Sequence, residues 1–255
     1  MLQQKTPGLQ LFIDRLTKRS LLTDGEIDAL MGLPTHTLQM APNHDFVRLD
    51  ERVDHACLVV AGLVGRFDQN SRGARQITAL HIAGDMPDLH SVVQPKATSA
   101  LQALSTATIL KVPHKALREV AAAYPAIAEA LWRDTMVDSM IMAQWVVNVG
   151  RRDAVCRIAH LLSEMACRYG VDTSGGAVVF KLPMTQSQLA DATGLTSVHV
   201  NRCIQRLTHS GVSFHHKTVH VDNWKALVAL GDFDRGYLQD DFSPEDRIRI
   251  APRAA

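Results

Sequence analysis

The sequence predicts an α+β protein in which short antiparallel strands are followed by one long helix and then by a compact, mainly helical unit. Three patterns favour this class. Residues 34–113 hold short apolar runs separated by glycine turns, residues 126–149 contain no Gly or Pro, and residues 185–211 hold two short helical patterns around a glycine. Strand-rich and helix-rich segments that are separated along the chain indicate α+β organisation.

The composition is that of a globular protein without a strong overall charge. Of 255 residues, 46% are hydrophobic and 21% charged, with 27 Lys and Arg against 26 Asp and Glu. This balance argues against binding nucleic acid through net charge alone. The distribution is less even, since residues 151–225 carry nine basic against five acidic side chains. That surplus is a modest footprint of the kind that phosphate contacts require.

The four cysteines Cys57, Cys156, Cys167 and Cys203 are scattered and form no C-x-x-C pair. This spacing argues against a structural zinc site and a disulfide framework, so we predict free, largely buried thiols, with no metal and no cofactor. The N-terminus lacks a signal-peptide pattern, and no apolar run approaches the length of a membrane span. We therefore expect a cytoplasmic protein with no membrane partner.

Two helices are predicted to precede the strands. They cover residues 9–31 with a break near Ser20, and Thr23 or Asp24 can cap the second. The strands that follow have the spacing of an antiparallel barrel or sandwich. They are expected at residues 56–60, 63–67, 76–82, 99–104 and 108–112.

A short helix over His114–Ala123 and a long helix over residues 126–149 come next. The long helix has two apolar stripes, and a helix with two apolar faces must bury both. Val137, Ile141 and Trp145 form one stripe. The other favours a two-fold dimer with a second copy of the chain, unless it too packs within the monomer. This second stripe is Trp132, Met136, Met140, Ala143 and Val147.

Residues 185–211 are predicted to form two short helices joined by a tight turn, after a helix at 154–169 and a strand at 177–182. Thr185 with Gln188 is a capping box that starts the first helix, and Thr196 can cap the second. Gly194 between them can take a positive φ at low cost, as a sharp turn requires. Apolar and small residues recur at helical spacing on one side of each helix. They are Leu189, Ala190, Leu195, Val200, Cys203, Ile204 and Leu207.

Polar side chains on the opposite side of this helix pair can contact DNA. Arginine can bind guanine, asparagine can bind adenine, and an apolar group can contact a thymine methyl. A helix-turn-helix docks its second helix in the major groove in this way, whereas a generic helical hairpin would only expose its polar face to water. The small residue Ala190, the turn residue Gly194 and the cationic face favour DNA binding over a generic helical hairpin. The candidate residues are Thr185, Gln186, Thr196, Ser197, Val198, His199, Asn201, Arg202 and Arg206.

Residues 212–221 alternate as strands at both ends around His215, His216 and Lys217, which predicts a β-hairpin. A hairpin directly after a recognition helix is a wing. Lys217 can contact a phosphate there, although an exposed lysine is more often only solvated. Residues 224–230 are expected to be helical and residues 240–255 to be a mobile, charged tail.

The order of these parts resembles the Crp/Fnr superfamily of bacterial regulators over about residues 9–237. The glycine-punctuated strands, Asp153–Ala159 and Leu195–Arg202 carry the resemblance. It implies a β-roll like that of cyclic-nucleotide-binding domains at 9–113, a linker and dimerisation helix at 114–149, a winged helix-turn-helix at 150–225, and a C-terminal helix and tail at 226–255. It also implies a homodimeric transcription factor on palindromic double-stranded DNA, with RNA polymerase as a further partner.

The recognition helix departs from the best-known members. The family's late arginine matches Arg202, but the glutamate that many members carry earlier falls at Val198, after Ser197. An apolar Val198 fits a thymine methyl, whereas a glutamate would accept a hydrogen bond from cytosine. We therefore expect a different operator sequence.

The cassette that binds cyclic AMP in the family is degenerate. The glutamate that holds the ribose is shortened to Asp88, the phosphate-binding arginine is Thr98, and the adenine-contacting pair falls at Met142 and Ala143. Since a charge-assisted hydrogen bond contributes about 1.5–3 kcal/mol, we do not expect cyclic AMP as effector. The small-molecule effector stays unidentified. The pocket residues implied by the resemblance are Asp88, Leu89, His90, Ser91, Thr98 and Ser99.

Other chemistry is less favoured. The N-terminus lacks the clustered cysteines of the family's iron–sulfur branch, and Cys57, His81 and His90 are expected to be structural more often than metal ligands. Asp88–Ser91 contains the side chains of a hydrolase triad, but neighbours on an extended chain point to opposite sides, so we expect no enzyme. The alternative function is a small-molecule sensor whose winged helix contacts a protein instead of DNA.

Overall fold

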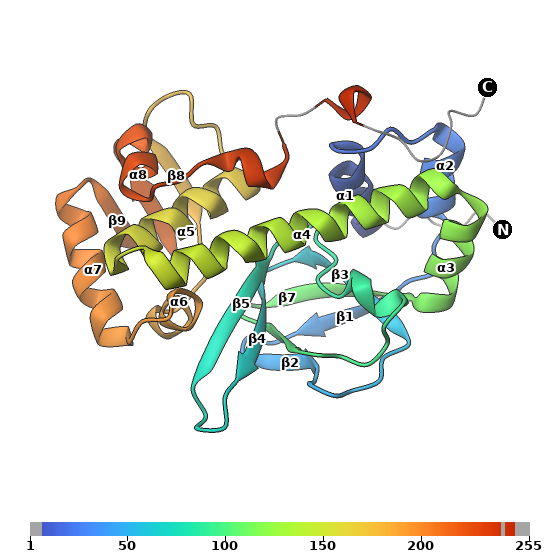
Figure 1. Cartoon of the computed structure of the whole chain (residues 1–255), viewed down its shortest axis with the longest axis horizontal. Helices are drawn as coiled ribbons and strands as arrows, with labels where there is room; N and C mark the ends of the chain where they lie inside the picture. The colour runs from blue at the N-terminus through green and yellow to red at the C-terminus, as the bar shows by residue number, and fades with distance from the viewer. Residues whose placement is uncertain (1–6, 241–242, 248–255) are drawn as a thin grey trace. The chain divides into compact units, whose positions relative to one another are not determined.

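The computed structural model describes residues 7–240 and 243–247, which fall into two compact units. The first unit contains the described residues up to Arg66, Leu80–Ser139 and those from Gln239 onward. The second contains Phe67–Ala79 and Met140–Leu238. The predicted α+β class is confirmed, with strands, a long helix and a helical C-terminal part in that order (Figure 1).

Two sheets form the strand-rich part of the chain. One has the order β1-β7-β3 and the other β2-β6-β4-β5. The five predicted strands are present as β3 to β7, and two more, β1 and β2, precede them. Their bounds are β1 His36–Met40, β2 His44–Val47, β3 His55–Ala61, β4 Val64–Gln69, β5 Arg75–His81, β6 Ala100–Ala103 and β7 Ala107–Pro113.

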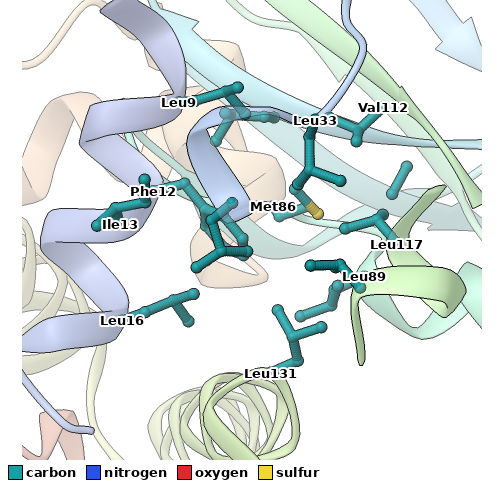
Figure 2. Close-up of a cluster of buried hydrophobic side chains, with 14 of the residues drawn as sticks. Leu9, Phe12, Ile13, Leu16, Leu33, Met86, Leu89, Val112, Leu117 and Leu131 are labelled. Atoms are coloured by element: carbon teal, nitrogen blue, oxygen red, sulfur yellow. The ribbon is translucent and has the colours of Figure 1, made fainter. Parts of the chain in front are cut away.

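The core of the first unit lies under its N-terminal helices, α1 (Pro7–Thr17) and α2 (Asp24–Met31). Thr23 caps α2 in a capping box with Glu26, as its sequence predicts. Figure 2 shows the cluster of buried apolar side chains that α1 shares with α3 (His114–Ala123), β7 and the segment after β5. Its labelled members include Leu9, Phe12, Leu16, Met86, Leu89, Val112 and Leu117.

The long helix α4 spans Pro125–Arg151 and has two different apolar faces. Val137, Ile141 and Trp145 are buried. Of the other stripe, Met140 is half-buried, whereas the remaining members are exposed in the single chain. These exposed members are Trp132, Met136, Ala143 and Val147.

The second unit is built on α5 (Ala154–Arg168), whose N-cap Asp153 accepts from the backbone N–H groups of Val155 and Cys156. Its small sheet has the order β8-β10-β9. The remaining bounds are β8 Val178–Lys181, α6 Gln186–Thr193, α7 Ser197–His209, β9 Val212–His215, β10 Thr218–Val221 and α8 Trp224–Leu230.

The described part of the segment predicted as a mobile tail, residue 240 and residues 243–247, makes contacts with the rest of the first unit. Asp240 forms an ion pair with Arg19, at 2.7 Å between Oδ1 and Nη2, and Arg247 donates to the Gln239 carbonyl at 2.9 Å. Arg19 is buried and needs a carboxylate partner, which explains why the chain is held there. Residues 241–242 and 248–255, which share that prediction, lie outside the described residues.

None of the helices within residues 7–240 and 243–247 combines the length and apolar character required to cross a membrane.

Candidate nucleic-acid interface

The turn between α6 and α7 has the predicted local structure. Thr185 and Gln188 form a capping box, with 3.1 Å from Gln188 N to Thr185 Oγ1 and 2.9 Å from Thr185 N to Gln188 Oε1. Gly194 takes φ 65°, a left-handed conformation that ends α6, and the Thr196 side chain then caps α7. The two helices are therefore joined by a turn that the sequence specifies residue by residue.

One side of α7 is buried on the scaffold of the second unit. Val200, Cys203 and Leu207 have almost no exposed surface, and the helix packs on α5, α6 and β9. Ala190 on α6 is also buried, at a position where a larger side chain would separate the helices. This packing fixes which side of α7 remains outside (Figure 1).

All the predicted DNA-contacting side chains are exposed. Among them is the apolar Val198, which is 65% exposed. An open depression of about 350 Å³ runs along this side of α7. It is lined by Thr196, Val198, His199, Arg202, Cys203 and Arg206.

The exposed side of α7 is cationic and free of carboxylates. Residues 192–221 contain no Asp or Glu, whereas they contain Arg202, Arg206 and Lys217. Within the described part of the chain, the guanidinium groups of Arg202 and Arg206 have no carboxylate partner. Cations without internal partners are available to phosphate oxygens or guanine edges.

Two side chains from outside α6 and α7 form hydrogen bonds to the turn between these helices, and neither contact was predicted from the sequence. Arg157 on α5 donates to the Thr193 carbonyl at 3.2 Å, and Gln76 on β5 donates to the Ala192 carbonyl at 3.3 Å. Both donate to carbonyl groups at the end of α6, which have no partner within the helix and need donors from outside it. Gln76 could not be found because nothing in the chain order indicates that β5 reaches this turn.

A buried polar cluster stabilises the base of the second unit. The Glu164 carboxylate, with no exposed surface, accepts hydrogen bonds from Trp145 Nε1 at 3.0 Å and Tyr237 Oη at 2.8 Å and pairs with Arg168 at 3.1 Å. Burial, followed by the charge of Glu164, strongly raises the pKa of Tyr237, so the phenol stays a donor. The cluster ties α4, α5 and the segment after α8 together.

The comparisons with known proteins agree with this geometry. The sequence pattern of the Crp-like helix-turn-helix domain matches residues 156–230. The chain is 26% identical over 75% of its length to the electron transport regulator A of Shewanella oneidensis, of which it covers 76%. It is also 20% identical over 84% of its length to the fumarate and nitrate reduction regulatory protein of Shigella dysenteriae, of which it covers 86%.

The solved structure of FixK2 from Bradyrhizobium japonicum superposes with a TM-score of 0.70 at 26% identity, covering 78% of this chain and 98% of that one. The chain belongs to the Crp/Fnr family. The resemblance on which the fold was predicted is thereby confirmed, and the protein is a Crp/Fnr-type transcriptional regulator.

In this Crp/Fnr regulator the residues of the expected effector pocket do come together, but the pocket is nearly closed. Its volume is about 10 Å³, enough for no more than one water molecule. Leu89 is the exception, because it is buried in the apolar cluster of Figure 2 instead of lining this pocket. The lining includes Arg66, Asp88, His90, Ser91, Thr98 and Ser99.

Asp88 is turned toward the protein backbone. Its Oδ1 accepts from the Cys57 N–H at 2.7 Å, while Oδ2 is buried without a hydrogen-bond partner among the described residues. Burial raises the pKa of Asp88 to about 6, although the Cys57 N–H works in the opposite direction. Burial, with Arg66 nearby, lowers the pKa of His90.

The segment Leu89–Val92 is a 3₁₀ helix, so the prediction that Asp88–Ser91 is extended is wrong. A tight turn allows the side chains to diverge, and Ser91 Oγ lies 2.7 Å from His114 Nε2 while Asp88 binds the backbone. Elsewhere, His81 lies buried with Nδ1 3.8 Å from Asp85 Oδ2. Within the described residues, no three His, Cys, Asp or Glu side chains are grouped to hold a metal ion.

Met142 and Ala143, which the resemblance aligns with an adenine-contacting pair, are both exposed on α4. Of the four cysteines, which are all free, Cys57 and Cys203 are buried, whereas Cys156 and Cys167 are only half-buried.

Proposed function

We propose that this Crp/Fnr regulator is a homodimer that binds a palindromic operator with α7 in the major groove. The observation that carries the proposal is the exposed, carboxylate-free side of α7, where Arg202 and Arg206 pair with no carboxylate of the described residues and Val198 is 65% exposed. A surface of this composition is matched to a polyanion that also presents methyl groups and acceptor edges.

The contacts divide between bases and phosphates. In this proposal Arg202 donates two hydrogen bonds to a guanine, Asn201 pairs with an adenine, and Val198 packs on a thymine methyl. Side chains around the starts of α6 and α7 contact phosphates, because helix N-termini favour negative charge. These include Thr185, Gln186, Thr196, Ser197 and His199, with Arg206 and Lys217 as further cations.

The exposed stripe of α4 supports a homodimer. Trp132 is 58% exposed, and Met136, Val146 and Val147 are also accessible along the same helix. An apolar stripe of this kind needs a partner, and the same stripe of a second copy satisfies a two-fold arrangement. Two α7 helices would then lie one DNA turn apart, roughly 34–36 Å.

We infer that cyclic AMP is not the effector of this regulator. A pocket of about 10 Å³ lined by Asp88 and Thr98 offers neither the volume of a ligand site, about 300–1,000 Å³, nor a phosphate-binding arginine at residue 98. Regulation through this pocket would require it to open.

The test begins with selection of bound fragments from random duplex DNA. The affinity of the selected palindrome is then compared with that of a single half-site and of scrambled DNA. We expect the palindrome to bind most tightly, and Arg202→Ala to lose about 1–3 kcal/mol of discrimination at one base position in each half-site. Arg48→Ala, which removes an exposed arginine from the first unit, is the matched control and should leave discrimination unchanged.

Equal affinity for selected and scrambled DNA would contradict operator recognition, and equal affinity for palindrome and half-site would contradict the dimer. Binding that does not change with salt would favour a protein partner for the winged helix, because neutralised phosphates make log K fall steeply with log salt.

A further inference from the structure

The outer face of the small sheet in the second unit carries two histidines on neighbouring strands. Strands β9 and β10 pair in antiparallel register, with His215 opposite Thr218 and His220 opposite Ser213. Side chains alternate between the two faces of a sheet, so these four residues share one face. The other face is buried and apolar. Its members include Val212, Val219 and Val221.

The imidazole rings of the two histidines are in contact. The ring centroids of His215 and His220 lie 5.8 Å apart, with an angle of 65° between the ring planes. The two residues are diagonal neighbours across the strand pair, a separation that aromatic side chains can bridge. Because the strands pair residue by residue from Val212 to His215, the backbone holds both histidines in place and the rings converge from fixed positions.

Neither ring is used in a polar contact of the fold. Within residues 7–240 and 243–247, the nitrogen atoms of His215 and His220 form no hydrogen bond or ion pair. His215 is exposed, and the ring nitrogens of the half-buried His220 reach the surface. A structural histidine of the same unit differs in this respect, since the Nδ1 atom of His160 is buried at 3.0 Å from the Gly231 carbonyl oxygen.

Two neutral imidazoles at this separation can chelate a metal ion. Bonds between Zn²⁺ and histidine nitrogen are about 2.0–2.1 Å long, which places the centroids of two ligating rings roughly 5 Å apart in tetrahedral coordination. The observed separation of 5.8 Å is close to this value and needs only a small rotation of the side chains. Imidazole nitrogen suits Zn²⁺, Cu²⁺ and Ni²⁺, whereas Mg²⁺ and Ca²⁺ require oxygen ligands.

We propose that His215 and His220 form a two-histidine site for a divalent transition-metal ion on the outer face of this sheet. The two rings supply the protein ligands, water completes the coordination, and the bound ion cross-links β9 to β10. Residues 192–221 contain no Asp or Glu, so the site is built from neutral nitrogen ligands alone. The inference does not depend on the proposed function, because neither histidine is assigned to a base or a phosphate.

Zn²⁺ titration of the full chain by calorimetry tests the site, with Mg²⁺ as the ion that should not bind. His215→Ala removes one ligand at an exposed position, and His220→Phe keeps a ring beside His215 but removes its nitrogens. Two linked ligands bind about 100-fold or more tightly than one, so either variant should lose Zn²⁺ affinity by about that factor. His216→Asn is the matched control, since asparagine tolerates the positive φ of 47° at that residue and the affinity should be kept.

Two further measurements separate a metal site from ring packing. Zn²⁺ should raise the unfolding temperature of the natural chain and of His216→Asn, but of neither ligand variant, because only a folded hairpin holds both rings together. The electron paramagnetic resonance spectrum of bound Cu²⁺ should show two nitrogen ligands in the natural chain and lose this signature in His215→Ala and His220→Phe.

Equal Zn²⁺ affinity in the natural chain and in either folded ligand variant overturns the site and leaves the ring contact as packing only. A comparable loss in His216→Asn also overturns it, because the binding would then be adventitious and shared among exposed histidines. Far-ultraviolet circular dichroism without metal checks that each variant is folded. If His220→Phe is not folded, His215→Ala decides the outcome, because its exposed position contributes little to stability.

Discussion

The exposed side of α7 and the pocket beside Asp88 differ in how their polar groups are used. On α7, Arg202 and Arg206 point away from the fold without carboxylate partners among the described residues. In the pocket, Asp88 accepts from Cys57 N, Ser91 contacts His114, and the free volume is about 10 Å³. The cations of the first surface remain available to an external ligand, whereas most polar groups of the pocket form hydrogen bonds within the protein.

This difference shows that the two halves of a family fold can diverge independently. A recognition surface keeps its capacity to bind as long as its exposed positions carry donors and cations, and Val198 changes only which base is favoured. A ligand cavity requires both volume and matched charges, and the pocket beside Asp88 has a volume of about 10 Å³ and a threonine at residue 98. The exposed side of α7 therefore keeps the composition of a nucleic-acid interface, whereas this pocket lacks the volume of a ligand site.

The largest expected effect is a difference in stability between a variant on the buried side of α7 and one on its exposed side. Leu207→Ala should lower the free energy of unfolding by about 2–5 kcal/mol, because it leaves a cavity at a fully buried position. Val198→Ala, on the opposite side, should change stability by no more than about 0.5 kcal/mol while weakening preference for a thymine in the selected operator. Urea unfolding and operator competition measure the two quantities.

A destabilised Val198→Ala would show that this side chain has a packing role, and the comparison between the two sides would fail. An unchanged operator preference in a stable Val198→Ala variant would remove Val198 from the base-contacting set.

The next effect concerns the pocket and depends on pH. The pKa of Asp88 is raised from its ordinary value of 3.8 to about 6 in the folded chain, so the folded state binds this proton more tightly. The free energy of unfolding should therefore fall as pH rises from about 4 to about 6, by at most about 3 kcal/mol. Asp88→Asn should lack this contribution, so its stability relative to the natural chain should improve over that interval.

Urea unfolding of both chains between pH 4 and pH 8 checks this expectation. Burial also raises the pKa of Asp138 to about 6, and Arg15 opposes that shift. Since Asp138 is present in both chains, the difference between them isolates Asp88. Parallel pH profiles would mean that the Asp88 carboxylate is hydrated in solution and that the pocket is more open than about 10 Å³.

Local rules were sufficient wherever a residue's role depends on its near neighbours. The caps at Thr23, Thr185 and Thr196 and the turn at Gly194 follow from side-chain donors and backbone freedom within four residues, and all four are present. The strands β1 and β2 were not predicted individually because His36–Met40 and His44–Val47 are short and largely exposed, so they lack an apolar alternation.

Long-range contacts could not be predicted in the same way. The role of Gln76 at the end of α6, the cluster around Glu164 and the pairing of Arg19 with Asp240 join residues far apart in sequence. The volume of the pocket also depends on how whole strands pack. Sequence could show that Thr98 lacks a phosphate-binding charge, but it could not show that the space itself is almost filled.

The smallest expected effect tests whether the missing charge at residue 98 or the missing volume excludes cyclic AMP from the pocket. Cyclic AMP at 1 mM should stabilise the natural chain by less than about 0.4 kcal/mol, the value for a Kd near 1 mM, and thermal unfolding measures it. Thr98→Arg restores a cation but adds bulk to a pocket of about 10 Å³, so we expect it to bind no better. If Thr98→Arg gains a dose-dependent upward shift, then the pocket opens at little cost and the missing charge alone excluded the nucleotide. If it gains none, closure of the cavity is sufficient to separate this regulator from the members that sense cyclic AMP.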